Sequence, residues 1–144
     1  MMSLPLPEFE KPVKLLLVVA DAEAHVENAV LMMDAHNIGF ELLDMPSSAE
    51  IPTAIAIAAR MSNFDGFVVL ADAQTPESAQ GLQMLGLQGL CIGYGLNSKD
   101  ADKATSAVAA ALHLVATSRK WGRPDNGVGF TSEILLAQGG KTTA

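Results

Sequence analysis

The sequence predicts an α/β fold built on a parallel β-sheet. Two observations carry this prediction: short apolar runs recur four times along the 144 residues, and each is followed by a segment with helical periodicity. Continuous apolar runs are typical of strands that are covered on both faces, as in parallel sheets. Strands that alternate with helices form right-handed βαβ units, which place helices on both faces of the sheet.

The first repeat begins with the apolar run from Val13 to Ala20, which predicts a buried strand. Asp21 follows as a helix cap, and the apolar residues between Val26 and Met33 fall on one helical face. We expect Gly39 to end this helix, because glycine readily adopts the left-handed conformation common at helix C-termini. Residues 40–43 then predict a short second strand.

The next two repeats carry clear helix-start signals. Ser47-Ser48-Ala49-Glu50 has the spacing of a capping box, in which a serine and a glutamate three residues later satisfy free amides. The helix that follows has an apolar stripe from Ile51 onward and ends between residues 63 and 66. Residues 66–71 predict a third strand. Thr75-Pro76-Glu77 then offers a threonine cap, a proline at the first position and an early acid.

The fourth repeat and the two ends complete the predicted organisation. Residues 90–95 predict the last strand, and an alanine-rich helix follows over residues 101–118. We expect one α/β domain over residues 13–121. The prolines in residues 1–12 make that segment an extended arm. Residues 122–144 are expected to be a C-terminal tail with a possible short helix.

For four parallel strands we choose the flavodoxin-like order 2-1-3-4, which gives a three-layer αβα sandwich. In such sheets, ligands bind beyond the carboxyl ends of the strands. We therefore expect a binding site formed by the segments that follow the four strands, at residues 20–23, 44–50, 71–75 and 95–98.

Composition argues against several function classes. The net charge of −7 argues against a nucleic-acid partner. A single cysteine, Cys91, excludes an intrachain disulfide, and no run approaches the roughly 20 apolar residues of a membrane span. The N-terminus lacks the basic and apolar regions of a signal peptide, so we expect a cytoplasmic protein. With 49% hydrophobic and only 17% charged residues, some apolar surface is expected to be covered in a homo-oligomer.

Three stretches match a family pattern. Residues 45–52 are similar to the motif P-G-A-x-E-I-P through Pro46, Glu50, Ile51 and Pro52, and they stand between a strand and a helix. Residues 63–70 are similar to the block that leads into the family's third strand, and residues 87–104 to its fourth strand. Over roughly residues 13–118 the chain thus resembles lumazine synthase, an enzyme family of riboflavin biosynthesis.

The resemblance implies a transferase that condenses a ribitylamino-pyrimidinedione with a four-carbon keto-phosphate. It implies no metal and no cofactor. It also implies a pentamer or a higher assembly, with each active site between adjacent subunits. The motif at residues 46–52 contacts the ribityl chain in that family, which makes Glu50 and the backbone of residues 47–49 the positions to carry over.

Several family features are absent. The family's stacking aromatic ring after the first strand corresponds to Asp21-Ala22-Glu23, and loss of stacking costs on the order of 1 kcal/mol. After the third strand, the phosphate-binding segment is several residues shorter, with Thr75 at the family threonine and Glu77 near the proton-transferring histidine. Gly93 or Tyr94 replaces the usual phenylalanine. The basic residue of the last helix has no clear counterpart.

The candidate site residues follow from this comparison. Glu77 is a weak candidate for proton transfer, since a carboxylate can act as a base. Asp72 and Glu77 would repel a phosphate, whereas the helix-start amides after Thr75 can hold an anion. The expected ligand-binding residues are Ala22, Ser47, Ser48, Ala49, Glu50, Asp72 and Thr75.

Structural roles compete with these assignments. Glu50 can serve only to close the capping box, and the three histidines stand on predicted helices without metal-ligand spacing. Asp21 and Asp72 are similar to the strand-end acids of receiver domains, but the fifth strand and its lysine are missing. Three functions remain open. The first is a divergent member of the family that binds a flavin-like or polyol compound at subunit interfaces, with the condensation lost or altered. The second is an active lumazine synthase, and the third is a non-catalytic structural or partner-binding subunit.

Overall fold

The computed structural model describes residues 5–20, 23–71, 76–96 and 101–122. The chain divides into two compact units, residues 1–114 and residues 115–144. The sheet, the first three helices and the last helix as far as Leu114 lie in the first unit. The described part of the second unit is helical as far as Trp121.

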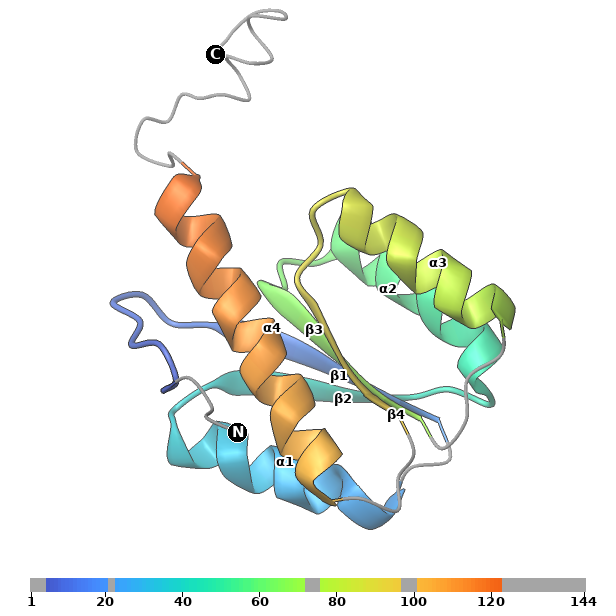
Figure 1. Cartoon of the computed structure of the whole chain (residues 1–144), viewed down its shortest axis with the longest axis horizontal. Coiled ribbons are helices and arrows are strands. Elements are labelled where there is room, and N and C mark those ends of the chain that lie inside the picture. The colour runs from blue at the N-terminus through green and yellow to red at the C-terminus, as the bar shows by residue number, and fades with distance from the viewer. Residues whose placement is uncertain (1–4, 21–22, 72–75, 97–100, 123–144) are drawn as a thin grey trace, which may run out of the picture. The chain divides into compact units, whose positions relative to one another are not determined.

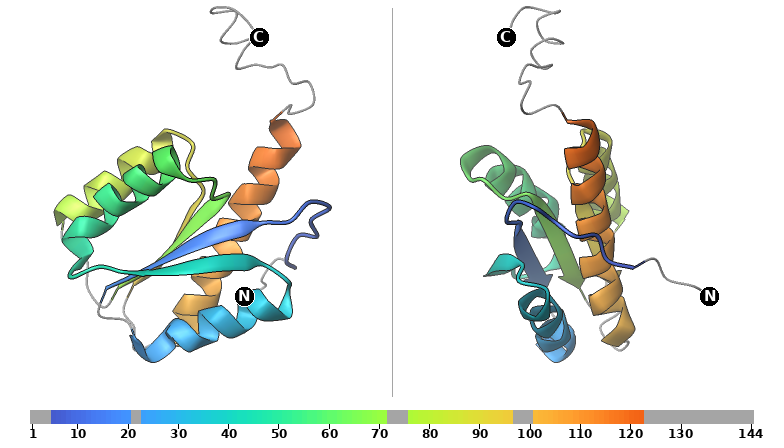
Figure 2. Two further views of the ribbon diagram at one scale, coloured as in Figure 1. Left: turned by 180° about the vertical axis from the view of Figure 1, so that it is seen from behind. Right: turned by 90° about the vertical axis from the view of Figure 1, so that its left-hand side faces the viewer.

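The sheet is parallel and has four strands in the order β2-β1-β3-β4 (Figure 1), which confirms the predicted order and fold class. One face is covered by α1 and α4 and the other by α2 and α3, as the left view in Figure 2 shows. The elements are β1 (Lys14–Ala20), α1 (Glu23–Ala35), β2 (Gly39–Asp44), the 3-10 turn η1 (Ser48–Glu50), α2 (Ile51–Met61), β3 (Gly66–Ala71), α3 (Pro76–Leu87), β4 (Ile92–Leu96) and α4 (Ala101–Trp121).

The core on the α2–α3 side forms because alternate residues of the central strands point to one face. Every residue of β3 and all but the first of β1 are buried, as expected for strands covered on both faces. From the helices, Ile51 and Ile55 of α2 and Leu82 of α3 are completely or almost completely buried against this face. This packing holds the start of α2 firmly at the carboxyl edge of the sheet.

The opposite face is shaped by an unusually close approach of α4 to β4. A Cβ atom on Gly93 would lie 1.9 Å from the carbonyl oxygen of Ala107, and one on Gly95 would lie 2.8 Å from that of Lys103. Only glycine permits backbone-to-backbone packing at these separations. The alanines of α4 contribute to the same contact, and Ala104, Ala107 and Ala111 are all buried.

The predicted end of the first helix was wrong. Gly39 is the first residue of β2 and donates its N–H to the carbonyl of Val13, whereas Asn37 takes the left-handed conformation with φ 59°. Asparagine tolerates this conformation because its short polar side chain can hydrogen-bond locally. The left-handed residue therefore stands two positions before the predicted glycine, the helix ends at Ala35, and the second strand gains Gly39 and Asp44.

Other boundaries also moved. α2 ends at Met61 with Ser62 as its C-cap, and β4 runs from Ile92 to Leu96 instead of over residues 90–95. α4 continues three residues past 118, to Trp121. No helix in the described part of the chain is long and apolar enough to cross a membrane. Residues 5–12 hold no helix or strand, and the divisions at residues 12 and 121 stay predictions.

Candidate site at the carboxyl edge of the sheet

The four strands end level with one another at one edge of the sheet. Val19 is in register with Asp44, Ala20 with Ala71, and Ala71 with Leu96. The turn η1 and the first turns of α2 and α3 therefore begin at this common edge. In parallel α/β sheets this is the edge at which ligands bind, and the described candidate residues lie there.

The best-defined part of the site is the turn at Ser47–Glu50, and the predicted capping box is confirmed. The Ser47 hydroxyl donates to Glu50 Oε1 at 2.7 Å, and the Ser47 N–H donates to the same oxygen at 3.0 Å. The Ala49 N–H in turn donates to Ser47 Oγ at 3.2 Å. These bonds fix one carboxylate oxygen of Glu50 within the turn and hold the side chain in a defined orientation.

Burial divides this turn into an anchored part and an accessible part. Ser48 is 7% exposed, and Ile51 is completely buried in the α2–α3 core. Ala49 and Glu50 are exposed. The turn thus presents the Glu50 carboxylate on a rigid base, an arrangement suited to hydrogen bonds with hydroxyl groups of a ligand.

An apolar groove of about 670 Å³ adjoins this turn, between β2 and the outer flank of α2. Ala49 and Glu50 form one end of its lining. Two of the lining side chains are highly accessible, since Ile57 is 53% exposed and Met61 is 78% exposed. The remaining lining residues are Leu43, Met45, Thr53, Ala54, Ala58 and Ser62.

Glu77 lies in the first turn of α3 and is exposed, next to the buried Ser78. Residues of α3 contact η1, so the structure brings this helix start and the Ser47–Glu50 turn together. Ala22, Asp72 and Thr75 lie outside the described residues. The ligand-binding and proton-transfer roles assigned to all these residues stay predictions.

The described residues make the carboxyl edge acidic. Asp44 ends β2, Glu50 ends η1, and Glu77 and Asp102 stand in the first turns of α3 and α4. Against these four carboxylates, the same part of the structure offers the amine of Lys103. No group of three metal-ligating side chains occurs among the described residues. An anionic ligand would meet net repulsion at this edge.

Tyr94 is a site candidate that was not assigned from the sequence. It lies on β4 between Gly93 and Gly95, whose missing side chains face α4, so the tyrosine faces the other side of the sheet. Its side chain is 41% exposed, and partial burial raises the pKa of its phenol above the usual value of 10.0. The available signal was the match of Gly93 or Tyr94 to the family's usual phenylalanine, although neither was assigned to the ligand-binding residues.

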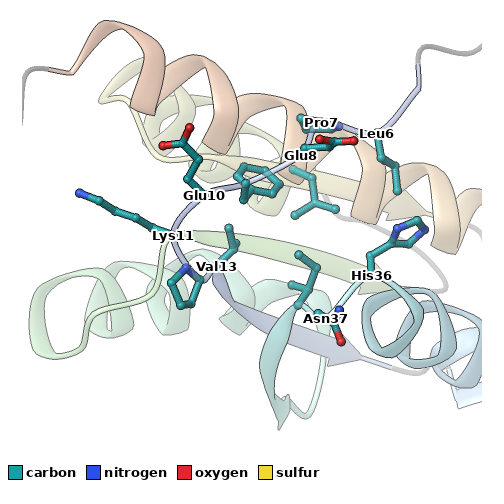
Figure 3. A pocket seen from close by; sticks show the side chains of 12 residues that line it. Leu6, Pro7, Glu8, Glu10, Lys11, Val13, His36 and Asn37 are labelled. Atoms are coloured by element: carbon teal, nitrogen blue, oxygen red, sulfur yellow. The ribbon is translucent and has the colours of Figure 1, made fainter.

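A second cavity, of about 440 Å³, lies at the amino end of the sheet (Figure 3). Residues 6–13 of the N-terminal arm form much of its wall, and His36, Asn37, Ile38 and Leu112 complete it. None of the predicted site residues lines this cavity. The candidate functional site is therefore confined to the carboxyl edge and its adjoining groove.

Three relatives are similar to this chain over most of its length. A 6,7-dimethyl-8-ribityllumazine synthase from Jannaschia sp. (strain CCS1) is 40% identical over 156 aligned positions, covering 89% of this chain and 88% of the relative. Enzymes of the same name from Sphingopyxis alaskensis and Novosphingobium aromaticivorans are 30% and 29% identical. Those matches cover 74% and 73% of this chain, and 96% and 87% of the relatives. No protein-family model matches the chain.

The alignments also show how many aligned positions have no residue in this chain. The 156 positions shared with the Jannaschia relative hold about 128 residues of this chain, which is 89% of 144, so about 28 positions face gaps. The 135 positions shared with the Sphingopyxis relative hold about 107 residues, again leaving about 28 gaps. The predicted shortening after residue 71 stays a prediction. With 40% identity across 89% of its length, this chain belongs to the 6,7-dimethyl-8-ribityllumazine synthase family.

Proposed function

We propose that this chain binds a ribityl-bearing small molecule, such as a lumazine or a flavin, at an interface between subunits and no longer catalyses the family condensation. The observation that carries the proposal is the intact Ser47–Glu50 turn at an otherwise acidic strand edge. This turn is the part of the family site that contacts the ribityl chain, here called the polyol side, and it is present. The phosphate and proton-transfer side has lost the residue types it requires.

The polyol side rests on Glu50. One carboxylate oxygen accepts from Ser47, which orients the group, and the exposed carboxylate offers further acceptor positions to ligand hydroxyls. Charge-assisted hydrogen bonds of this kind are roughly twice as strong as neutral ones. A ribityl chain, with several adjacent hydroxyls, has the chemistry that such a carboxylate recognises.

The proposed loss of the condensation rests on charge and on residue type. Ala22 cannot stack on a heterocycle, and Glu77 stands near the position of the family's histidine. Four carboxylates of the described residues stand at the edge of the sheet where a keto-phosphate would bind, against one described lysine. Binding of the phosphate-bearing substrate is therefore disfavoured before any chemical step.

We further propose that the chain works as a homo-oligomer, a pentamer or a higher assembly, in the cytoplasm. Apolar side chains are exposed at both outer strands of the sheet: Leu42, Ile57 and Met61 beside β2 and α2, and Met84, Leu87 and Tyr94 beside α3 and β4. Two different surfaces on opposite edges fit a head-to-tail contact, which generates a ring when the rotation closes. In that arrangement Tyr94 of a neighbouring copy approaches the groove next to Glu50.

A paired assay tests the proposal. The purified protein is titrated with 6,7-dimethyl-8-ribityllumazine and its fluorescence is followed; separately, it is incubated with both family substrates and lumazine absorbance is recorded. We expect saturable binding without lumazine formation. Light scattering is expected to give an oligomer, and a monomer at micromolar concentration would contradict the interface site.

The second candidate is an active lumazine synthase, which the 40% identity to the Jannaschia enzyme favours. This candidate predicts turnover without the usual ring and histidine, because the family reaction depends partly on holding two substrates together. The third candidate, a structural or partner-binding subunit, predicts an oligomer that neither binds the lumazine nor forms it. The same two assays thus separate all three functions.

A further inference from the structure

We infer that Gly81 is a positioning residue for the candidate site: it lets α3 pack directly on Pro52, and this contact sets where Glu77 stands relative to the Ser47–Glu50 turn. The inference deepens the proposed function and rests on it for its meaning in ligand binding. It concerns a contact between Pro52 of α2 and Gly81 of α3, which are 29 positions apart in the sequence.

The contact leaves no room for a side chain at residue 81. A Cβ atom on Gly81 would lie 2.9 Å from Cβ and 3.0 Å from Cγ of Pro52. Separations this short require a shift, and the obstacle is a rigid proline ring in the first turn of α2 instead of the end of a flexible side chain. Gly81 therefore fixes how near α3 lies to the start of α2.

Helical periodicity connects this contact to the site. Residues four apart lie on the same face of a helix, so Glu77 stands one turn before Gly81 on the flank of α3 that faces α2. On α2, Pro52 follows Glu50 by two residues and shares its flank with Ala56 and Ala59. Small residues on both helices permit the close approach, and the first turn of α3 is thereby held beside η1, which α3 contacts.

The buried side chains of α3 restrict how this helix can respond to a substitution at Gly81. Ser78 and Leu82, both 1% exposed, face the sheet and prevent the helix from rolling freely. A shift forced at residue 81 must therefore move the helix away from Pro52 as a unit, and it carries Glu77 away from the turn. Because α3 also contacts η1, the same displacement removes support from the turn that orients the Glu50 carboxylate.

Gly86 provides a matched control on the same helix. A Cβ atom on Gly86 meets nothing within 4 Å, so Gly86→Ala makes the same chemical change without a contact. Both substitutions raise helix propensity by a similar amount. Any difference between Gly81→Ala and Gly86→Ala therefore reports the contact with Pro52.

The experiment measures binding of 6,7-dimethyl-8-ribityllumazine and amide hydrogen exchange of residues 45–52 in the full-length protein. For Gly81→Ala we expect binding about tenfold weaker, as for the loss of one charge-assisted hydrogen bond to Glu50. We also expect faster exchange of the Ser47 and Ala49 amides, which donate to Glu50 Oε1 and to Ser47 Oγ. Gly86→Ala is expected to match the wild type in both. In a Pro52→Gly background, Gly81→Ala should cost nothing further, because the obstructing ring is gone.

The outcomes separate this inference from the proposed function. A wild-type protein that does not bind the lumazine refutes the proposed function, while the exchange pattern still tests the positioning role. The inference is overturned if Gly81→Ala exchanges and binds as Gly86→Ala does. It is equally overturned if Gly81→Ala costs as much in the Pro52→Gly background as in the wild-type background, a comparison that remains readable even if the single variant folds poorly.

Discussion

Replacement of Glu50 by glutamine separates the two roles that this side chain can have. As a structural residue, Glu50 accepts hydrogen bonds from the N–H and the hydroxyl of Ser47 through Oε1 alone. A glutamine amide oxygen can occupy the same position and accept the same two bonds. The substitution therefore keeps the capping box and removes the negative charge that the proposed function assigns to ligand binding.

The magnitudes of the two effects differ. Glu50 is exposed, and surface charges contribute little to stability, so we expect Glu50→Gln to change the free energy of unfolding by less than about 0.5 kcal/mol. A hydrogen bond to a charged group exceeds a neutral one by roughly 1 to 1.5 kcal/mol. At about 1.4 kcal/mol for each factor of ten, binding of 6,7-dimethyl-8-ribityllumazine should weaken about tenfold.

Urea unfolding and a fluorescence titration measure the two effects on the same samples. Glu41→Gln is the matched control, since Glu41 is an exposed acid of β2 whose carboxylate pairs with Lys14 at 2.8 Å, outside the turn. Ser47→Ala calibrates the cap: loss of its hydroxyl should cost about 1 kcal/mol of stability. Unchanged binding in Glu50→Gln would refute the reasoning, because Glu50 would then serve the turn alone.

Three further predictions concern the fold. Gly93→Ala should destabilise the protein by about 3 kcal/mol or prevent folding, because the new methyl group collides with the backbone of α4 at Ala107; urea unfolding measures it. Leu82→Ala should cost about 3 kcal/mol through a cavity in the α2–α3 core, and an unfolding midpoint near that of the wild type would contradict this burial. Burial, and secondarily the Asp65 carboxylate, raise the pKa of the Cys91 thiol. The buried neutral thiol therefore contributes its full share of the folding stability below the ordinary thiol pKa of 9.0, and this contribution is lost as the pH rises above it. Cys91→Ala should accordingly reduce the loss of stability at alkaline pH.

The central strands were predictable because strands buried on both faces have continuous apolar runs in the sequence. Residues 66–71 were identified to the residue, and the run from Val13 to Ala20 differs from β1 by one position. The end of α1 was missed since Asn37 and Gly39 both satisfy the local signal, and the hydrogen bond from Gly39 to Val13 comes from a different strand. Sequence periodicity does not reveal a hydrogen bond to a distant strand.

The site was predictable in the same uneven way. The capping box is local, so the spacing of Ser47 and Glu50 was sufficient to identify it. The groove beside Ile57 and the contact between Pro52 and Gly81 depend on how helices pack, and they were not foreseen. Gly81 read in isolation only weakens a helix, whereas in the structure its missing side chain is what allows the two helices to meet.

The central claim is that this member of the lumazine synthase family keeps the polyol side of the site without the condensation. The most direct measurement incubates the protein with the ribitylamino-pyrimidinedione and the keto-phosphate, alongside the Jannaschia relative at equal subunit concentration, and follows lumazine absorbance. The account predicts no lumazine above the uncatalysed rate from this chain, while the same preparation binds added 6,7-dimethyl-8-ribityllumazine. Lumazine formation at a rate comparable to that of the relative would contradict it.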